Sequence, residues 1–596
     1  MGERIKIVLS ADANSQEKFA AEELVYFLKE VSGAEGIIVT EDNFNSCSSE
    51  LYFSVGLTES FKNAIGFNGL FDSVGEDGYR IVSKNSCIYI CGGAGQGTIF
   101  GVYRYLKETF NLIIYTETVY TYDYKPLRFD PIDILEKPDL PMRALGIFPV
   151  HLEKREPMLG NKRYCYRMRL RQMDEGWGIN NHSYFRILPP NVYKEAHPDW
   201  YNKNATQLCL TNKSAIKEYV KNMKKVIENT PNDSLYMFGM EDTIEFCDCP
   251  KCMKIINKYG YAWLSLSFAN KLAKELNKWL KKAHPERKVY FFTFAYNKAI
   301  LPPVKKIAEG KYELLVKNVK LEDNLGVLIA PIHTSANYPL TDTRSYYALS
   351  TCYNGKERIS NIDLFGGWRA IVKYLAVWTY NRNFYDYMTP CPMWVGFKEN
   401  FKWFKELNAI HVFMEAGCTM RSNFSEMKIF VCSNLMWDTS LEQDQLVRQF
   451  MKVYFEGADE QIYEYFSYIH EHAEWMRKIY GREQIYVHFD DDPNKRLLDV
   501  RFWPKEMFFK CLDIFNNALS KDIKPEVFNR INIETIPVKF SLLRLYLKEL
   551  DKNFALSLID DMVAIANKND MSYATDEKPE TIQAFAEKWK KELLCV

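Results

Sequence analysis

The sequence lacks a net charge, a basic block and a long hydrophobic run. Its 596 residues hold 77 Lys and Arg against 77 Asp and Glu, so the formal net charge is zero. A nucleic-acid-binding protein needs a basic surplus or stripe, and we therefore expect no nucleic-acid partner. A transmembrane helix needs about 20 consecutive apolar residues. No such run is present, and no membrane span is expected.

The first residues, MGERIKIVLSADANSQ, lack the apolar segment of a secretory signal peptide. The sequence as given therefore predicts a cytoplasmic protein, or a periplasmic or secreted one if a signal peptide has been removed. Most of the 14 cysteines stand singly, as buried thiols do in a reducing compartment.

Aromatic residues are abundant, with 38 Tyr, 38 Phe and 12 Trp making up 15% of the chain. Many of them must belong to hydrophobic cores. Tyr and Trp also suit sugar binding, because the ring stacks on an apolar face while its polar edge forms a hydrogen bond. Composition leaves both interpretations open.

The pattern of apolar residues predicts three regions. Residues 1–125 alternate short strands with helices and indicate a small α/β domain. Four glycines at positions 92, 93, 95 and 97 do not form the dinucleotide-binding pattern, and a tight turn from strand to helix explains them. Residues 421–596 read as helices throughout and indicate an all-α C-terminal region.

Residues 140–420 predict a (β/α)8 barrel of the TIM type. Eight short apolar runs alternate there with helical stretches: RALGIFPV, GWGINNHSYF, TQLCLTN, SLYMFGMED, VYFFTFAYN, LGVLIAPIHT, YLAVWTYNRN and IHVFMEAG. In such barrels the loops that follow the strands carry the chemistry. Polar residues that close these runs are therefore the candidates for an active site.

Three acids stand at such strand ends. Glu241 and Asp242 are adjacent after SLYMFGM, and Glu415 closes HVFME. Hydrolysis of a glycosidic bond needs two carboxyl groups at a fixed separation, one of them protonated. Acids at a helix N-terminus are the alternative for Glu241 and Asp242. The candidates for sugar binding at the other strand ends are His182, Tyr296, His333, Trp378, Tyr380 and Asn383.

Cysteines crowd behind the paired acids. Cys247, Cys249 and Cys252 form a C-x-C-x-x-C hook, and Cys209 is a possible fourth thiol. Four thiolates can hold a structural zinc ion. Disulfides and packed free thiols are the alternatives. On each interpretation the thiols brace the loop that carries Glu241 and Asp242, and the chemistry itself needs no cofactor.

Several segments together resemble domain-of-unknown-function family 4838, a family common in gut bacteria that degrade glycans. They are NNHSYFRILPPNVYKEAHPDWY, QLCLTN, FCDCPKC, WTYNRNFYDYMTPCP, HVFMEAG and NLMWD. The N-terminal segments QEKFAAEELVYFLKEVSGAE and GQGTIFGVYRYLKETFNL resemble the α/β domain that precedes the barrel in α-glucuronidases and hexosaminidases.

Part of that family is classed as glycoside hydrolase family 163, endo-β-N-acetylglucosaminidases acting on N-glycans. The resemblance implies a retaining, substrate-assisted hydrolase of an oligosaccharide or glycoprotein glycan. We expect Asp242 to be the general acid/base and Glu241 its polarising neighbour. Glu415 is the alternative second carboxylate and would suit an inverting, α-glucuronidase-like enzyme. A non-catalytic carbohydrate-binding protein and an assembly protein are the other hypotheses.

Overall fold

The computed structural model describes most of the chain. The described residues are 4–44, 51–66, 70–147, 151–152, 159–334, 338–349, 358–381, 388–390, 394–416, 423–480, 498–574 and 580–595. They form two compact units. The first unit joins Met1–Gln172 to Phe424–Asp459, and the second joins Met173–Asn423 to Glu460–Val596. The boundaries expected from sequence, near residues 125, 140 and 421, remain predictions.

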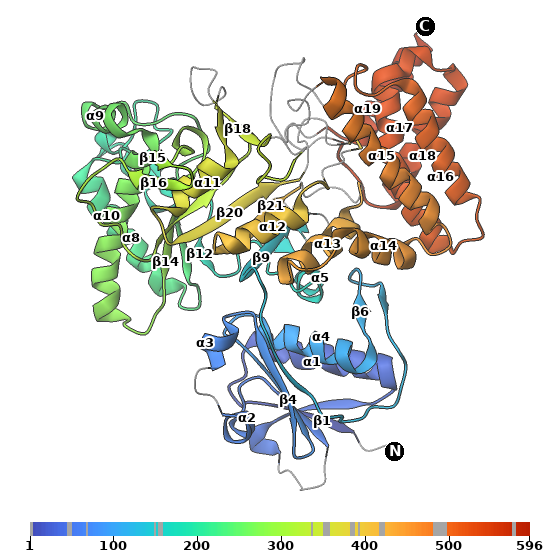
Figure 1. The fold of residues 1–596 in the computed structure, drawn as a ribbon, viewed down its shortest axis with the longest axis horizontal. Helices are drawn as coiled ribbons and strands as arrows, with labels where there is room; N and C mark the ends of the chain where they lie inside the picture. The colour runs from blue at the N-terminus through green and yellow to red at the C-terminus, as the bar shows by residue number, and fades with distance from the viewer. Residues whose placement is uncertain are drawn as a thin grey trace. The chain divides into compact units, whose positions relative to one another are not determined.

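The first unit contains the expected α/β sheet, with strand order β2-β1-β3-β5-β4-β8. Its strands are β1 (Ile5–Leu9), β2 (Gly36–Thr40), β3 (Tyr52–Val55), β4 (Tyr79–Lys84), β5 (Cys87–Gly92) and β8 (Asp133–Glu136). Helices α1 (Ser15–Ser32) and α4 (Gly97–Phe110) pack side by side on this sheet (Figure 1). Asn14 caps α1 and forms a capping box with Glu17, which fixes the start of the helix.

The glycines between β5 and α4 serve a tight turn, as predicted. A Cβ atom on Gly92 would lie 2.0 Å from the backbone carbon of Gly97, and one on Gly97 would lie 2.1 Å from the carbonyl oxygen of Gly78. Only glycine allows the backbone to approach so closely.

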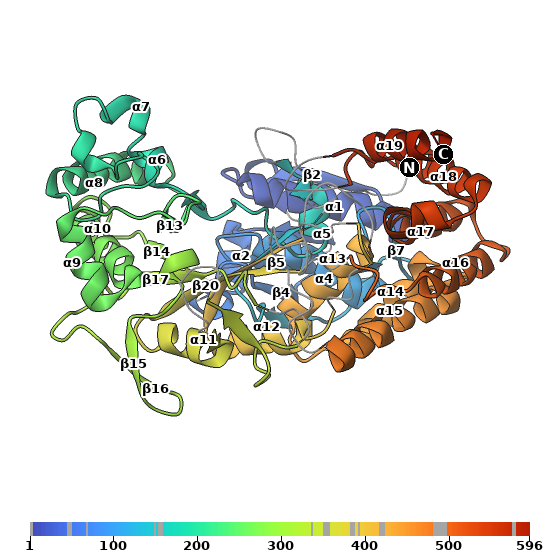
Figure 2. The same cartoon turned by 90° about the horizontal axis from the view of Figure 1, so that it is seen from above.

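The second unit is built on a curled parallel sheet. Its strands pair in the order β12 (Trp177–Ile179), β13 (Leu235–Phe238), β14 (Tyr290–Ala295), β17 (Leu325–Ile329), β20 (Tyr374–Tyr380) and β21 (Ala409–Glu415). The connecting helices include α8 (Lys213–Asn229), α9 (Pro250–Tyr259), α10 (Tyr261–Ala283), α11 (Asn361–Arg369) and α12 (Phe397–Glu406). Figure 2 shows α8, α9 and α10 along one side of β13, β14 and β17. The predicted TIM-like fold class is confirmed, in the form of a partial barrel.

One of the eight predicted strands is wrong. The segment TQLCLTN is not a strand, and Leu208 forms only an isolated bridge with Tyr201. Its polar groups are satisfied locally: the N–H of Gln207 donates to the Asn202 side chain, and the N–H of Cys209 donates to the Trp200 carbonyl. The first run, RALGIFPV, does contain a strand, β9 (Met142–Gly146), within the residues of the first unit.

The predicted C-terminal helices are confirmed. Two of them belong to the first unit: α13 (Ser425–Trp437) and α14 (Gln443–Tyr454). The others are α15 (Asp459–Tyr480), α16 (Lys505–Leu519), α17 (Pro525–Tyr546), α18 (Lys552–Lys568) and α19 (Ile582–Leu594). Successive helices from α16 to α19 pack against each other (Figure 1). Among the described residues, none of the helices has the length and apolar character needed to cross a bilayer.

Candidate active site

A cavity of about 210 Å³ opens at the C-terminal ends of the parallel strands in the second unit. Strands β20 and β21 supply Trp378, Tyr380 and Glu415. The segments that follow β12, β13 and β14 supply Asn181, His182, Asp242 and Tyr296. Carboxyl ends of parallel strands meet at one edge of a sheet, so residues far apart in the chain converge here.

Glu415 is held by its neighbours on β20. Tyr380 lies opposite Glu415 in the strand register, and Trp378 lies two residues earlier on the same face. The indole Nε1–H of Trp378 donates to Oε2 of Glu415 at 2.7 Å. Glu415 is half-buried, and this hydrogen bond fixes the direction of its carboxylate.

Asp242 follows β13, which is not a neighbour of β21 in the sheet, and it is more exposed than Glu415. Its side chain is 64% exposed, and the hydroxyl of Tyr296 donates to Oδ1 at 3.1 Å. The Nε2 atom of His182 lies 4.0 Å from the same oxygen. The Nδ1 atom of His182 contacts the carbonyl oxygen of Met240, so Nδ1 carries a proton and Nε2 faces Asp242.

Two phenols, those of Tyr296 and Tyr380, line the cavity together with the acids. Burial, followed by the charge of Asp242, raises the pKa of Tyr296 well above its usual value, and Glu415 adds to this effect. Burial, followed by Glu415, raises the pKa of Tyr380 in the same way. Both phenols therefore stay protonated at neutral pH, and that of Tyr296 donates a hydrogen bond to Asp242. Both phenols line the same cavity as Asp242 and Glu415.

Glu241 does not line this cavity. Its Oε1 atom accepts the backbone N–H of Phe185 at 2.8 Å, at the start of the short helix α6 (Tyr184–Ile187). Its backbone is paired at both polar atoms with the side-chain amide of Gln207. Burial raises the pKa of Glu241, and the N–H of Phe185 opposes that shift. The carboxylate of Glu241 therefore meets a helix N-terminus, but of α6 rather than of a helix that the two acids begin, and Asp242 faces the cavity instead.

The remaining predicted ligands are placed differently. His333 is buried and packs with its ring 5.3 Å from that of Tyr347, and it is not among the residues that line the cavity. Asn383 lies outside the described residues. The residues missed from sequence are the lining residues Asn181, Phe294, Ala330 and Ile332 and the positioning residue Gln207. Asn181 and Phe294 flank strand ends that were already singled out, whereas nothing in the sequence pairs Gln207 with Glu241.

The four predicted thiols come together. The sulfur atoms of Cys209, Cys247, Cys249 and Cys252 all lie within 4.8 Å of one another. They lie beside the loop that leads away from Asp242, at the start of α9.

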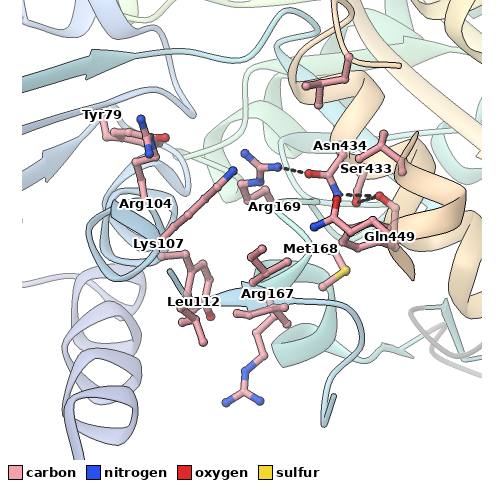
Figure 3. A pocket seen from close by; sticks show the side chains of 16 residues that line it. Tyr79, Arg104, Lys107, Leu112, Arg167, Met168, Arg169, Ser433, Asn434 and Gln449 are labelled. Atoms are coloured by element: carbon pink, nitrogen blue, oxygen red, sulfur yellow. Dashed lines mark hydrogen bonds between the residues drawn. The ribbon is translucent and has the colours of Figure 1, made fainter. Parts of the chain in front are cut away.

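A second cavity lies in the first unit and has a different character. Figure 3 shows the side chains of Arg104, Lys107, Arg167 and Arg169 around it, and none of its lining residues is acidic. Its arginines are engaged: Arg104 with Glu136, Arg167 with Glu23 and Arg169 with Asn434. This cavity therefore offers no carboxyl group for hydrolysis among its lining residues, and its three arginines have structural partners.

Comparison with known proteins supports the fold. The family model described as a domain of unknown function, DUF4838, matches residues 114–467. No curated protein matches the chain. Among solved structures, a family GH115 4-O-methyl-α-glucuronidase with specificity for decorated arabinogalactans is 12% identical, with a TM-score of 0.57. The match covers 96% of this chain and 76% of that one.

Two further structures have lower scores. A GH138 enzyme targeting pectin rhamnogalacturonan II is 11% identical and has a TM-score of 0.46, with 99% of this chain and 79% of that chain covered. An N-acetyl-β-hexosaminidase of Streptomyces plicatus is 9% identical and has a TM-score of 0.36, with 74% and 89% covered. At these identities the likeness concerns the fold.

Proposed function

We propose that this chain, which belongs to the DUF4838 family, is a glycoside hydrolase in which Asp242 and Glu415 are the two catalytic carboxyl groups. One observation carries the proposal: both acids line the same cavity at the C-terminal edge of the parallel sheet. Glycosidic hydrolysis needs such a pair, and catalytic residues of TIM-type barrels stand at this edge.

The surroundings of the two acids suggest their roles. A general acid/base must exchange a proton with solvent in every turnover, and Asp242, with its side chain 64% exposed, can do so. Its Oδ1 accepts the Tyr296 hydroxyl, which leaves Oδ2 to carry the transferred proton. Glu415 is less exposed and is oriented by the Trp378 indole, as suits a group that stabilises charge in the transition state.

The described lining favours an uncharged sugar. It contains aromatic residues and two acids but no Arg or Lys that could pair with the carboxylate of a uronic acid. Trp378, Tyr296 and Tyr380 offer rings and polar edges for a pyranose. The substrate class that fits, and that the motifs of the chain also suggest, is a complex glycan cleaved at an N-acetylglucosamine residue.

A retaining, substrate-assisted reaction fits these residues. The acetamido oxygen of the substrate attacks C1 while Asp242 donates its proton to the departing glycosidic oxygen. Glu415 accepts the acetamido N–H and stabilises the positive charge of the resulting oxazolinium. Water then attacks C1 and gives its proton to Asp242, which restores both the acetamide and the acid.

Product analysis tests the proposal. The protein is incubated with a panel of N-glycans and aryl glycosides, and products are identified by mass spectrometry and NMR. Asp242→Asn and Glu415→Gln should each lower the rate by about 10²- to 10⁴-fold. Glu275→Gln is the matched control, because Glu275 is an exposed acid of the same unit that pairs with Lys278 on α10. Glycan binding without turnover by the parent would instead indicate a carbohydrate-binding protein.

The leaving group separates the two roles. A glycoside with an acidic leaving group, such as dinitrophenol, departs without protonation. Asp242→Asn should therefore retain much more activity on that substrate than on the natural glycan, whereas Glu415→Gln should lose both activities. If instead Glu415→Gln kept activity on that substrate and Asp242→Asn lost it, Glu415 would be the general acid and Asp242 the charge-stabilising group. Inhibition by a thiazoline analogue of N-acetylglucosamine would support participation of the acetamide.

A further inference from the structure

The four thiols beside the Asp242 loop are arranged around a common centre. The sulfur of Cys209 lies 3.7 Å from that of Cys249 and 3.8 Å from that of Cys252, and all four sulfurs lie within 4.8 Å of one another. Cys209, Cys247 and Cys252 are buried, and Cys249 is half-buried. They come from two segments separated by helix α8, so the chain folds back to bring them together.

These distances match the geometry of a metal site. Four thiolates at about 2.3 Å from a zinc ion, at the corners of a tetrahedron, place their sulfurs roughly 3.8 Å apart. A disulfide would need a pair at about 2.05 Å. Cys209 lies almost equally far from the sulfurs of Cys249 and Cys252, so the arrangement favours no single disulfide pair. We propose that Cys209, Cys247, Cys249 and Cys252 bind one structural zinc ion.

The surroundings of the sulfurs suit bound thiolates. The backbone N–H of Cys252 points to the sulfur of Cys249 at 3.5 Å, at the N-terminal end of α9, where the helix dipole favours negative charge. The hydroxyl of Thr211 lies 3.2 Å from the sulfur of Cys252 and 3.5 Å from that of Cys209. Donors of this kind around the ligands orient them and offset the excess negative charge of four thiolates.

The site would clamp two segments that flank the candidate catalytic acid. At one end, the side chain of Gln207 pairs with the backbone of Glu241. A few residues later, the Glu245 carboxylate accepts hydrogen bonds from Asn202, Asn204 and Thr206. The four sulfurs complete this connection between residues 202–209 and 241–252. This role rests on the proposed function: the zinc ion holds the loop that positions Asp242 and does not contact the substrate.

Metal content tests the site directly and does not depend on any activity. The full chain, purified under reducing conditions without chelator, should contain one zinc ion per chain by elemental analysis. Treatment with a mercurial thiol reagent should release that ion, and reconstitution with cobalt(II) should give the intense ligand-field bands of a tetrahedral thiolate complex. A clearly substoichiometric zinc content without cobalt uptake would overturn the proposal, as would a disulfide between two of the four cysteines or iron as the bound metal.

Cysteine variants locate the ion. Cys249→Ser changes the most exposed of the four ligands and should lower zinc retention at least tenfold in a competition with a chromogenic chelator. Cys511→Ala is the matched control, because Cys511 is a buried thiol on α16 outside the cluster, and this variant should retain one ion. Full zinc retention by Cys249→Ser and Cys209→Ser alike would refute the assignment. Zinc bound stoichiometrically by a chain that hydrolyses no glycan would uphold the site and refute the proposed function.

Discussion

Trp378 and Glu415 are joined across neighbouring parallel strands by a hydrogen bond of 2.7 Å from the indole N–H to the carboxylate. The two residues belong to β20 and β21, and the strand register places them on one face. A carboxylate that ends a buried strand would otherwise be costly. The indole thus satisfies Glu415 and aims it into the cavity.

Replacing Trp378 with phenylalanine tests this relationship. Trp378→Phe keeps an aromatic surface for the sugar but removes the donor to Glu415. A hydrogen bond to a charged group contributes about 1.5–3 kcal/mol, so we expect kcat/KM to fall about 10- to 100-fold. Trp403→Phe on α12 is the control, because Trp403 packs against Phe365 and does not line the cavity. If Trp378→Phe and Trp403→Phe lowered kcat/KM equally, the loss of activity would come from altered packing and not from the missing hydrogen bond.

Tyr296→Phe tests the donor to Asp242. The phenol contributes a hydrogen bond of 3.1 Å, and its loss should again lower kcat/KM about 10- to 100-fold. Burial and Asp242 raise the pKa of Tyr296 above the usual value of about 10, so the phenol stays protonated throughout the working range. The alkaline limb of the pH–rate profile should therefore persist in Tyr296→Phe, because ionisation of this phenol does not produce it. An alkaline limb that disappears in Tyr296→Phe would contradict this.

Much of the site could be anticipated because parallel strands impose a simple rule. Apolar runs of strand length that end in polar residues identified the segments carrying Asp242, Tyr296, Trp378 and Glu415, and the barrel pattern placed their ends at one edge. The C-x-C-x-x-C hook likewise indicated a thiol cluster.

Details decided by long-range side-chain contacts could not be anticipated. Past the end of β13 the chain no longer alternates, so sequence could not tell which of Glu241 and Asp242 faces the cavity. The hydrogen bonds between Gln207 and the backbone of Glu241, 34 residues apart, accompany that choice. The segment TQLCLTN has the apolar content of a strand, but contacts with Asn202 and Trp200 hold it as a loop.

Glu241→Gln tests whether the adjacent acid takes part in the chemistry. Glutamine can still accept the N–H of Phe185, so the helix cap should persist. We expect activity within about tenfold of the parent, in contrast to the loss of at least about 100-fold for Asp242→Asn. If a folded Glu241→Gln protein lost activity, the adjacent acids Glu241 and Asp242 would be the catalytic pair, as the sequence suggested.

The same variant has a predicted effect on stability. Burial raises the pKa of Glu241 in the folded state. The native protein therefore loses stability as the pH rises from the pKa of Glu241 in the unfolded chain to its pKa in the folded protein. Glutamine removes this dependence. Urea unfolding should therefore show Glu241→Gln to be at least as stable as the parent at pH 7. If the stability advantage of the variant over the parent grew as the pH fell, the predicted direction of the pH dependence would be wrong.

A buried ion cluster in the first unit was hidden from sequence analysis. Asp77 stands in the segment GEDG, and its side chain is fully buried. Its carboxylate accepts hydrogen bonds from the guanidinium groups of Arg143, at 3.0 Å, and Arg171, at 2.6 Å. These residues lie 66 and 94 positions further along the sequence. Burial alone would raise the pKa of Asp77, but the two guanidinium groups outweigh it and hold the pKa below its usual range.

Asp77→Asn should therefore destabilise the first unit strongly. The change leaves Arg143 buried without its counter-charge and leaves Arg171 with Glu76 alone, and breaking a buried pair in this way costs about 3–5 kcal/mol. Because the folded pKa of Asp77 is lowered, its contribution is fully present above the unfolded value of about 4 and is lost as the pH falls toward the folded value. Urea unfolding between pH 7 and pH 3 should show a loss of stability in acid that is smaller in the variant. Asp133→Asn is the control, because Asp133 is 64% exposed and pairs with Arg80 at the surface, where about 1 kcal/mol or less is expected. Equal losses from the two variants at pH 7 would mean that the buried cluster adds no more than a surface pair.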